Sequence, residues 1–399
     1  MFKNLLFISL FGVSAFADMM SFYQTAVKNL QYDKRYILDA KANKIAQSAI
    51  IYSKYTNFSV DIDYVKTYVA HLPKVSGNFD TTDIILHDTL DLFGKNDYKI
   101  HTLDLENKGK KSELERKKEQ LFIALANMIA LYNQTNAQLN IQKEFYDKEY
   151  KIYKKLEVLS QNGDVTELDI LRLKNTLSAL HINIVSMQQK LLTMKAQLHL
   201  YAPHQMIPQL RQTKLLYTKS DFLDHNPQIT LNKLHTQKLL SDAKGKKKSF
   251  IPTVDVSIAY QKLNDPTGYG DNHSFGIALQ VPLNGGNFQE AKAYKVMALE
   301  NESKNQEYQI QREQEYLQYY QAYQNAKKQL EVLEHSRKDF EKSEATIQQA
   351  YLKQYVDFST YLQVLQQTLQ VKNQIIMMQS QKQLALTIIN GIGSGKIYE

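Results

Sequence analysis

The stretch TVDVSIAYQKLNDPTGYGDNHSFGIALQVPLNGG, residues 253–286, decides the fold of this chain. Apolar and polar residues alternate over about 253–263 and again over about 273–283, and the residues between them are rich in Gly, Pro, Asn and Asp. A two-residue period places the apolar side chains on one face of a strand, and a turn-rich segment of this kind joins two strands. The stretch therefore predicts a β-hairpin with one apolar face and one polar face.

A second hairpin is expected earlier in the chain, with strands at about 57–69 and 82–93. Here too apolar residues such as Val60 and Ile62 alternate with polar ones. The polar positions that we assign to the second face of the strands, which would line the lumen of a barrel, are Asp61, Asp63, His87, Asp91 and Asp255. Half-buried strands of a soluble sheet show the same alternation, so the pattern alone does not decide what covers the apolar face.

Long helices are expected on either side of both hairpins. Residues 97–160 and 287–350 contain no proline, so each stretch can run as one helix of about 95 Å at ~1.5 Å per residue. Two further helices are expected at about 164–200 and 356–390. Because these helices have apolar seams of their own to bury, they are not free to cover the sheet. The context therefore favours a lipid-facing band on the hairpins.

The two halves of the chain repeat each other. Apolar residues at alternating spacings of four and three run from Leu173 to Leu198, which is the heptad pattern of a packed helix. The same positions 191 residues later are apolar at six of eight places, with Thr368 and Lys382 as the exceptions. We therefore divide the chain into a signal peptide at 1–17, a first repeat at 18–202, a linker at 203–220 and a second repeat at 221–399.

The first residues have the pattern of an export signal. Lys3 supplies the basic start, Leu5 to Val13 the short apolar region, and Ala15-Phe16-Ala17 the small-x-small cleavage site, so cleavage is expected near Ala17. No later stretch approaches the ~18 to 20 continuous apolar residues of a membrane-spanning helix, so the exported chain is expected to be either soluble or inserted as strands.

Composition excludes several kinds of site. The chain has no cysteine, which excludes disulfides, thiolate metal sites and a lipid-modified cysteine. Its formal charge of +8 is spread as Lys among Glu and Gln, a pattern typical of a solvated helix face rather than of a nucleic-acid surface. Phosphate-binding Gly-rich loops, nucleophile elbows and His-Glu-x-x-His pairs are missing, so we expect no enzyme, no cofactor and no metal site. Energy for any transport must come from another protein.

Four strands cannot close a membrane barrel, because the smallest have about eight and open edges are not tolerated in lipid. Several chains must therefore contribute strands to one barrel. The sequence predicts a mainly α fold with membrane β: an internally duplicated, long α-helical coiled-coil tunnel plus four strands per chain in a shared barrel.

Several short segments resemble motifs of one family. They are Asn226-Pro227-Gln228-Ile229, Phe250-Ile251-Pro252-Thr253-Val254, Val281-Pro282-Leu283-Asn284-Gly285-Gly286, Gly163-Asp164-Val165-Thr166-Glu167-Leu168-Asp169 and Ile392-Gly393-Ser394-Gly395. In this order and spacing they resemble the outer-membrane efflux proteins of the TolC type, the exit ducts of Gram-negative efflux pumps and type I secretion systems.

The resemblance implies a homotrimer whose twelve strands form one barrel in the outer membrane, continued by a helical tunnel into the periplasm. It also implies outer-membrane lipid around the barrel, a periplasmic adaptor protein and an inner-membrane pump of the RND or ABC type as partners. The exported cargo stays open among drugs, metal cations and polypeptides. A soluble periplasmic coiled-coil adaptor or structural protein, in which the hairpins form small sheets, is the alternative.

The resemblance further implies a gate at the periplasmic helix tips. Asp169 matches the position of an acidic ring, and Tyr351 matches a tip tyrosine that holds the helices shut. Where some members carry an Arg this chain has Val356, so closure is expected to rest more on packing of Val356, Phe358 and the tyrosines. An ordinary carboxylate in the first turn of a helix is the alternative for Asp169. The turns expected to dock the adaptor are Asn162, Gly163, Asp164 and Val165 in the first repeat, and Lys353, Gln354 and Tyr355 in the second.

Overall fold

A computed structural model describes residues 19–55, 57–72, 75–161, 165–211, 214–265, 268–353 and 355–399. The signal peptide expected at 1–17 lies outside these ranges, as do Asn162, Gly163, Asp164 and Gln354. Within the described ranges, no helix combines the length and the sustained hydropathy that crossing a membrane requires.

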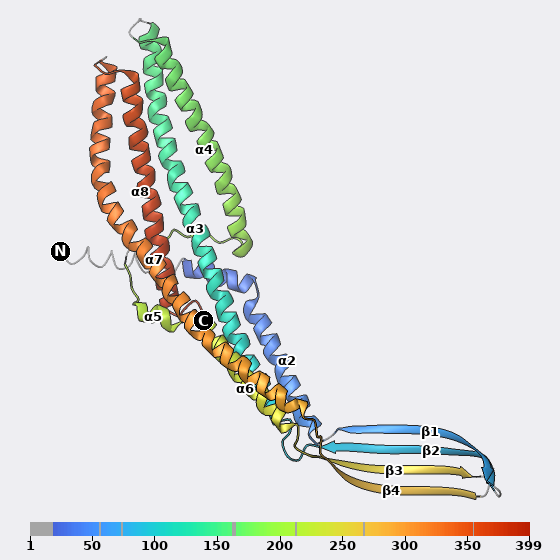
Figure 1. Ribbon diagram of the computed structural model, residues 1–399. Coiled ribbons are helices and arrows are strands. Elements are labelled where there is room, and N and C mark those ends of the chain that lie inside the picture. Colours follow the sequence, from blue (N-terminus) through green and yellow to red (C-terminus); the bar gives the residue numbers. More distant parts are fainter. Residues whose placement is uncertain are drawn as a thin grey trace. The chain divides into compact units, whose positions relative to one another are not determined.

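The chain forms two compact units (Figure 1). The first unit contains Met1–Asp33, Glu115–Asn226 and Ile310–Glu399, and the second contains Lys34–Leu114 and Pro227–Gln309. Each unit takes residues from both sequence repeats. The two units therefore do not coincide with the two repeats expected from the sequence.

Four long helices dominate the structure: α3 (Asp97–Gln161), α4 (Glu167–Tyr201), α7 (Gly286–Leu352) and α8 (Phe358–Gly393). α4 and α8 begin 191 residues apart, which is the offset of the repeat. Both have a side-chain cap, since Thr166 accepts from the backbone N–H of Asp169 and Asp357 from that of Thr360. The shorter helices are α2 (Tyr32–Ser53), α5 (Lys219–Asp224) and α6 (Pro227–Lys248).

The heptad seams lie in the interior of the first unit. Of the eight seam residues in α4, six are buried, and Met187 and Met194 are half-buried. In α8 the polar exception Thr368 is also buried, because its hydroxyl donates to the carbonyl of Val364 at 2.9 Å. Lys382, the other exception, is half-buried. A hydroxyl with a backbone acceptor can occupy a core position at little cost, which explains how the second seam tolerates Thr368.

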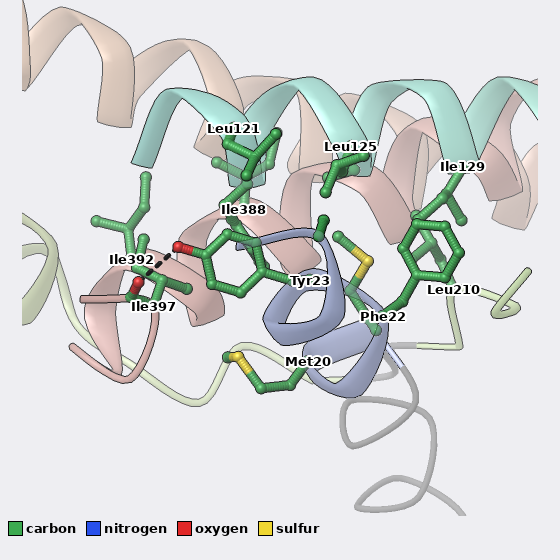
Figure 2. Packing of buried hydrophobic residues seen from close by; sticks show 14 of the residues in the cluster. Met20, Phe22, Tyr23, Leu121, Leu125, Ile129, Leu210, Ile388, Ile392 and Ile397 are labelled. Atoms are coloured by element: carbon green, nitrogen blue, oxygen red, sulfur yellow. Dashed lines mark hydrogen bonds between the residues drawn. The ribbon is translucent and has the colours of Figure 1, made fainter. Parts of the chain in front are cut away.

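The largest apolar cluster of the first unit joins residues from both ends of the chain (Figure 2). Helical residues 19–29 place Phe22 and Tyr23 against Leu125 of α3 and Ile392 of α8. The Tyr23 hydroxyl donates to the carbonyl of Ile397 at 2.6 Å, so the most polar atom of this cluster is satisfied. Burial of this many large side chains makes the cluster a main source of stability for the first unit.

Four antiparallel strands form one sheet in the second unit, in the order β1 (Phe58–Leu72), β2 (Val75–Leu90), β3 (Thr253–Asp265) and β4 (Gly268–Gln280). β2 begins seven residues and β4 five residues earlier than expected (Figure 1), because residues expected in turns, such as Gly77 and Gly270, pair with the neighbouring strand. β4 ends before Pro282, which has no N–H to continue a ladder. Long helices and four antiparallel strands per chain confirm the predicted fold of the single chain, while the barrel shared between chains stays a prediction.

The helices of the second unit are held together beside the sheet. Asn232 of α6 donates to the carbonyl of Asn301 in α7 at 2.6 Å, and Asn301 donates back to the carbonyl of Asn232 at 2.9 Å. On the other side, Lys238 of α6 pairs with Glu106 of α3 at 2.6 Å. Reciprocal amide contacts of this kind fix the register of two helices, because a shift of one turn would leave buried amides unpaired.

Candidate functional site

One face of the sheet is apolar along all four strands. The pairing register sets Ile62 opposite Ile84, Ile84 opposite Tyr260, and Ile258 opposite Phe275. Directly paired residues point to the same side, so the alternation in the sequence produces an apolar surface across the four strands, which Asp88 interrupts near the end of β2. The surface is exposed: Ile62 and Ile277 keep 67% and 68% of their accessible area.

The opposite face of the sheet is polar and carries most of the expected lining residues. The His87 ring lies 3.4 Å from the Asp61 carboxylate, and the Thr89 hydroxyl donates to Asp255 at 2.7 Å. Asp63 pairs directly with Asp83, an acidic residue not among the expected ones. The structure therefore brings Asp61, Asp63, His87 and Asp255 onto one face with an additional carboxylate.

Asp91 does not share that face, because it lies beyond the end of β2. Its carboxylate accepts from the backbone N–H groups of Lys95 and Asn96, both at 2.7 Å, and its side chain is buried. Gly94 within this turn has φ of 68°, a left-handed conformation that glycine adopts without strain. The prediction that Asp91 faces the lumen is therefore wrong, because β2 ends at Leu90 and Asp91 stabilises the turn between β2 and α3.

At the helix tips, the described turn residues differ in exposure. Val165 is half-buried and packs against the tip cluster, which we define as the apolar core around Leu173, Tyr351 and Phe358. Lys353 and Tyr355 are exposed, and Tyr355 keeps 79% of its area. An exposed tyrosine beside a lysine at the end of a helical hairpin is a surface that a partner protein can bind.

Tyr351 and Phe358 form the aromatic centre of the tip cluster. The Tyr351 ring stacks on Tyr361, with centroids 5.3 Å apart and planes 7° from parallel, and lies 5.4 Å from Phe358. Val356 packs partly buried against the same cluster. Burial, and then the nearby charge of Asp169, raises the pKa of Tyr351 to about 12. The residues expected to close the tips therefore hold the two helical hairpins of one chain together.

Asp169 occupies the first turn of α4. Its backbone N–H donates to the hydroxyl of Thr166 at 3.2 Å, while its own side chain is half-buried. The carboxylate therefore has no part in the cap, and it lies close enough to Tyr351 to help raise the pKa of that hydroxyl. Both readings of Asp169, as a first-turn carboxylate and as a group facing its neighbours at the tip, fit this placement.

A buried acid close to the tip cluster has no signal in the sequence. The Glu149 side chain in α3 is fully buried, and one of its oxygens accepts from the Tyr361 hydroxyl at 2.6 Å. Burial raises the pKa of Glu149 to about 7, although the Tyr361 hydrogen bond and the charge of Lys148 act in the opposite direction. Only the contact between α3 and α8 reveals the pair, because the two residues are 212 positions apart.

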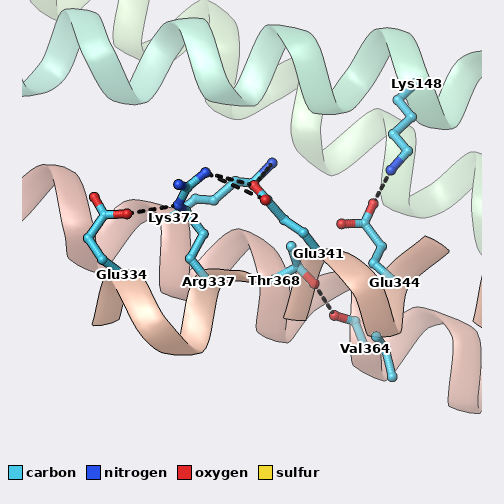
Figure 3. Close-up of polar contacts among 8 residues, drawn as sticks. All are labelled: Lys148, Glu334, Arg337, Glu341, Glu344, Val364, Thr368 and Lys372. Atoms are coloured by element: carbon cyan, nitrogen blue, oxygen red, sulfur yellow. Dashed lines mark hydrogen bonds and ion pairs between the residues drawn. The ribbon is translucent and has the colours of Figure 1, made fainter. Parts of the chain in front are cut away.

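Charged residues line a groove of about 390 Å³ between α3, α7 and α8. Figure 3 shows Arg337 with its partners Glu334 at 3.0 Å and Glu341 at 3.3 Å, and Lys372 reaches Glu341 at 3.4 Å. Nearby, Lys148 of α3 pairs with the buried Glu344 of α7. The Arg337 pairs lie within α7 and the Lys372 pair joins α7 to α8, whereas the Lys148–Glu344 pair connects this hairpin to α3. Nowhere in the described ranges do three His, Asp or Glu side chains gather in a way that could hold a metal ion.

Three solved outer-membrane proteins have a similar architecture, and two of them are described as channels. The outer-membrane channel OprN aligns with a TM-score of 0.81 at 12% identity, over 97% of this chain and 93% of that one. The outer-membrane protein VceC from Vibrio cholerae aligns with a TM-score of 0.75 at 15% identity, over 94% of this chain and 96% of that one. The CmeC outer-membrane channel of Campylobacter jejuni aligns with a TM-score of 0.74 at 14% identity, over 95% of this chain and 86% of that one.

No family model matches the chain, and no curated protein sequence does. The likeness is therefore one of fold, and it extends over nearly the full length of both partners in each comparison. The chain has the fold of the TolC-like outer-membrane channels.

Proposed function

We propose that this protein is an exit duct of the outer membrane, in which three copies join their sheets into one barrel and conduct substrates passively to the exterior. The observation that carries the proposal is the sheet itself. Its apolar face is exposed along all four strands, and within the described residues β1 and β4 each have a neighbour on one side only. Further copies that pair with these edges, and lipid that covers the apolar face, would satisfy both.

The polar face would then line the barrel lumen. Asp61, Asp63, Asp83 and Asp255 give it a surplus of carboxylates over the single histidine, His87. Acidic linings attract cations and repel anions at short range, so we expect the open channel to prefer cations. The preference describes the barrel and not the cargo, which the pump is expected to select.

The helix tips would form the periplasmic gate and the docking site for an adaptor. Asp169 and Tyr351 lie together at the tips, and the exposed Lys353 and Tyr355 present a surface on the second hairpin. The adaptor would connect the duct to an inner-membrane pump of the RND or ABC type. We assign no catalysis to this chain, since conduction through an open pore requires none.

Membrane fractionation and conductance together test the proposal. The full chain, expressed with its own leader, should appear in outer membranes as a heat-modifiable trimer. The purified trimer should open cation-selective channels in a planar bilayer. Release of the protein by osmotic shock, with no conductance, would support the soluble periplasmic coiled-coil protein instead.

A further inference from the structure

The helix ends beneath the sheet carry an unusual density of positive charge. Lys54 together with residues 91–99, 244–249 and 287–292 contributes eight lysines and only three carboxylates. The lysines are Lys54, Lys95, Lys99, Lys244, Lys246, Lys247, Lys248 and Lys292, and the carboxylates are Asp91, Asp97 and Glu290. A surplus of this size on one small surface calls for a partner of opposite charge.

Side-chain contacts hold these segments next to one another. Lys54 pairs with Asp97 at the start of α3, and Lys246 of α6 pairs with Glu290 of α7. Lys248 donates to the carbonyl of Gly94 at 3.3 Å, which fastens the end of α6 to the turn before α3. A side chain at Gly245 would clash with the Tyr98 ring, so α6 and α3 approach closely here.

Two exposed lysines of α6 form no ion pair among the described residues. Lys244 and Lys247 are three residues apart and share one side of the helix, and both are exposed. No carboxylate of the described chain pairs with either one. Favourable interaction with the end of the helix dipole explains a cation in the last turn, but it does not require two exposed ones.

Exposed apolar side chains surround the same helix ends. Leu92 and Phe93 precede α3, Leu283 precedes α7, and Phe288 stacks on Phe250 with ring centroids 4.2 Å apart. Leu283 keeps 87% of its area and Phe288 keeps 50%. Aromatic and aliphatic groups beside lysines, next to strands with an exposed apolar face, are characteristic of the boundary between a membrane and water.

We propose that Leu92, Phe93, Lys244, Lys247, Leu283 and Phe288 form a basal collar that binds anionic phospholipid headgroups of the leaflet nearest the helices. The proposal rests on the proposed function, because the collar meets lipid only when the sheet is inserted. The apolar members enter the edge of the hydrocarbon region, and the lysines reach the phosphates. A collar of this kind would fix the depth of the sheet in the membrane.

Lipid titration of the purified full-length protein in detergent tests the collar. Phosphatidylglycerol and phosphatidylcholine are added separately, and retention is followed by native mass spectrometry. We expect tighter binding of phosphatidylglycerol, and a loss of about fivefold per lysine, or roughly 25-fold, in the pair Lys244→Gln and Lys247→Gln. Phosphatidylcholine binding should not change.

Two matched pairs separate charge and place from folding. Lys244→Arg with Lys247→Arg keeps the charge and should keep the preference for phosphatidylglycerol. Lys327→Gln with Lys328→Gln removes two exposed charges of α7 in the first unit and should also keep it. Equal binding of both lipids by the unmodified protein, or an undiminished preference in the Lys244→Gln and Lys247→Gln pair, would overturn the collar. Bilayer conductance of the unmodified protein is measured in parallel, and its absence would count against the duct instead.

Discussion

At the scale of single residues, the first unit keeps ionisable groups inside an apolar core. Glu149 and Glu344 are both buried, but only Glu344 has a cation, Lys148, as a direct partner. Glu149 has the Tyr361 hydroxyl, and its second oxygen has no hydrogen-bond partner among the described residues. A buried carboxylate with a neutral partner favours its protonated form, because burial penalises the charge.

Glu149→Gln is expected to change how stability depends on pH. The folded-state pKa of about 7 lies above the ordinary 4.5, so the folded protein holds a proton that the unfolded chain releases between these values. The free energy of unfolding therefore falls as pH rises through that window and stays lower above it. Glutamine cannot ionise, so the variant should be more stable than the parent above pH 7, by up to about 3 kcal/mol, and similar near pH 4.5.

Thermal melts of both proteins at several pH values check this. Glu157→Gln is the control, since Lys154 lowers the pKa of that carboxyl and its loss should give no gain at high pH. A Glu149→Gln protein that melts with the parent at every pH would show that folding does not raise the pKa of Glu149.

Asp169→Asn tests the acidic ring at the tips. Three copies of this carboxylate around a narrow pore would attract cations, so the variant should show weaker cation selectivity in a planar bilayer. The Thr166 cap uses the backbone of residue 169, so helix α4 should form as before. Glu167→Gln removes a charge from the same turn at an exposed position and serves as the control. Identical behaviour of both variants and the parent would leave Asp169 as a first-turn carboxylate.

At the scale of elements, the two repeats pack their seams in different ways. Leu177 in α4 and Thr368 in α8 are equivalent positions of the repeat, and both are buried. Leu177 belongs to the tip cluster, whereas Thr368 directs its hydroxyl back to its own helix. The α4 seam therefore depends on apolar volume at this position more than the α8 seam does.

Substitutions at the equivalent positions should differ in cost. Leu177→Ala removes buried apolar volume and is expected to lower the free energy of unfolding by about 2 to 5 kcal/mol. Thr368→Val keeps the shape and removes a hydroxyl whose acceptor is already bonded within the helix, so the change should stay below about 1 kcal/mol. Denaturant unfolding followed by circular dichroism measures both. Equal losses at the two positions would contradict the difference between the seams.

At the scale of the whole molecule, the edges of the sheet decide how copies assemble. β1 and β4 lie at opposite edges, three strand spacings apart, which is about 14 Å at ~4.8 Å per spacing. A disulfide needs Cβ atoms about 3.5 to 4.5 Å apart, so cysteines on these two strands cannot join within one chain. The natural chain has no cysteine, and any bridge would therefore come from the introduced pair.

Ile62→Cys combined in turn with His273→Cys, Phe275→Cys or Ile277→Cys should give covalent multimers of up to three chains. At least one combination is expected to link copies on oxidation in membranes, because β4 of one copy would pair with β1 of the next. Electrophoresis without reductant measures the product. Ile62→Cys with Ile84→Cys is the control, since these residues face each other on β1 and β2 and should link within one chain. Monomers alone from all three test pairs would contradict a barrel shared between copies.

Periodicity allowed much of the fold to be predicted from the sequence, and contacts between distant residues account for most of the rest. Heptads and two-residue alternation mark α4, α8 and the centres of the strands because these patterns repeat along the chain. The start of β2 carries no such signal, and its pairing with β1 defines it. Asp91 and Glu149 were beyond prediction for a similar reason. Asp91 accepts hydrogen bonds from the turn that follows β2, and Glu149 is buried by its contact with Tyr361 of α8.

The pairing of β2 with β3 has a consequence for how the protein is made. Leu90 pairs with Val254, so the central ladder of the sheet closes a loop of about 160 residues. Loop closure of this length is slow compared with the formation of neighbouring helices, whose contacts are local. The edge of β2 that pairs with β3 must therefore stay open until the second half of the chain is available, although β1 and β2 can already pair with each other. During that interval the first hairpin is expected to bind chaperones. Mutations that delay folding of the second half should promote aggregation through the first hairpin.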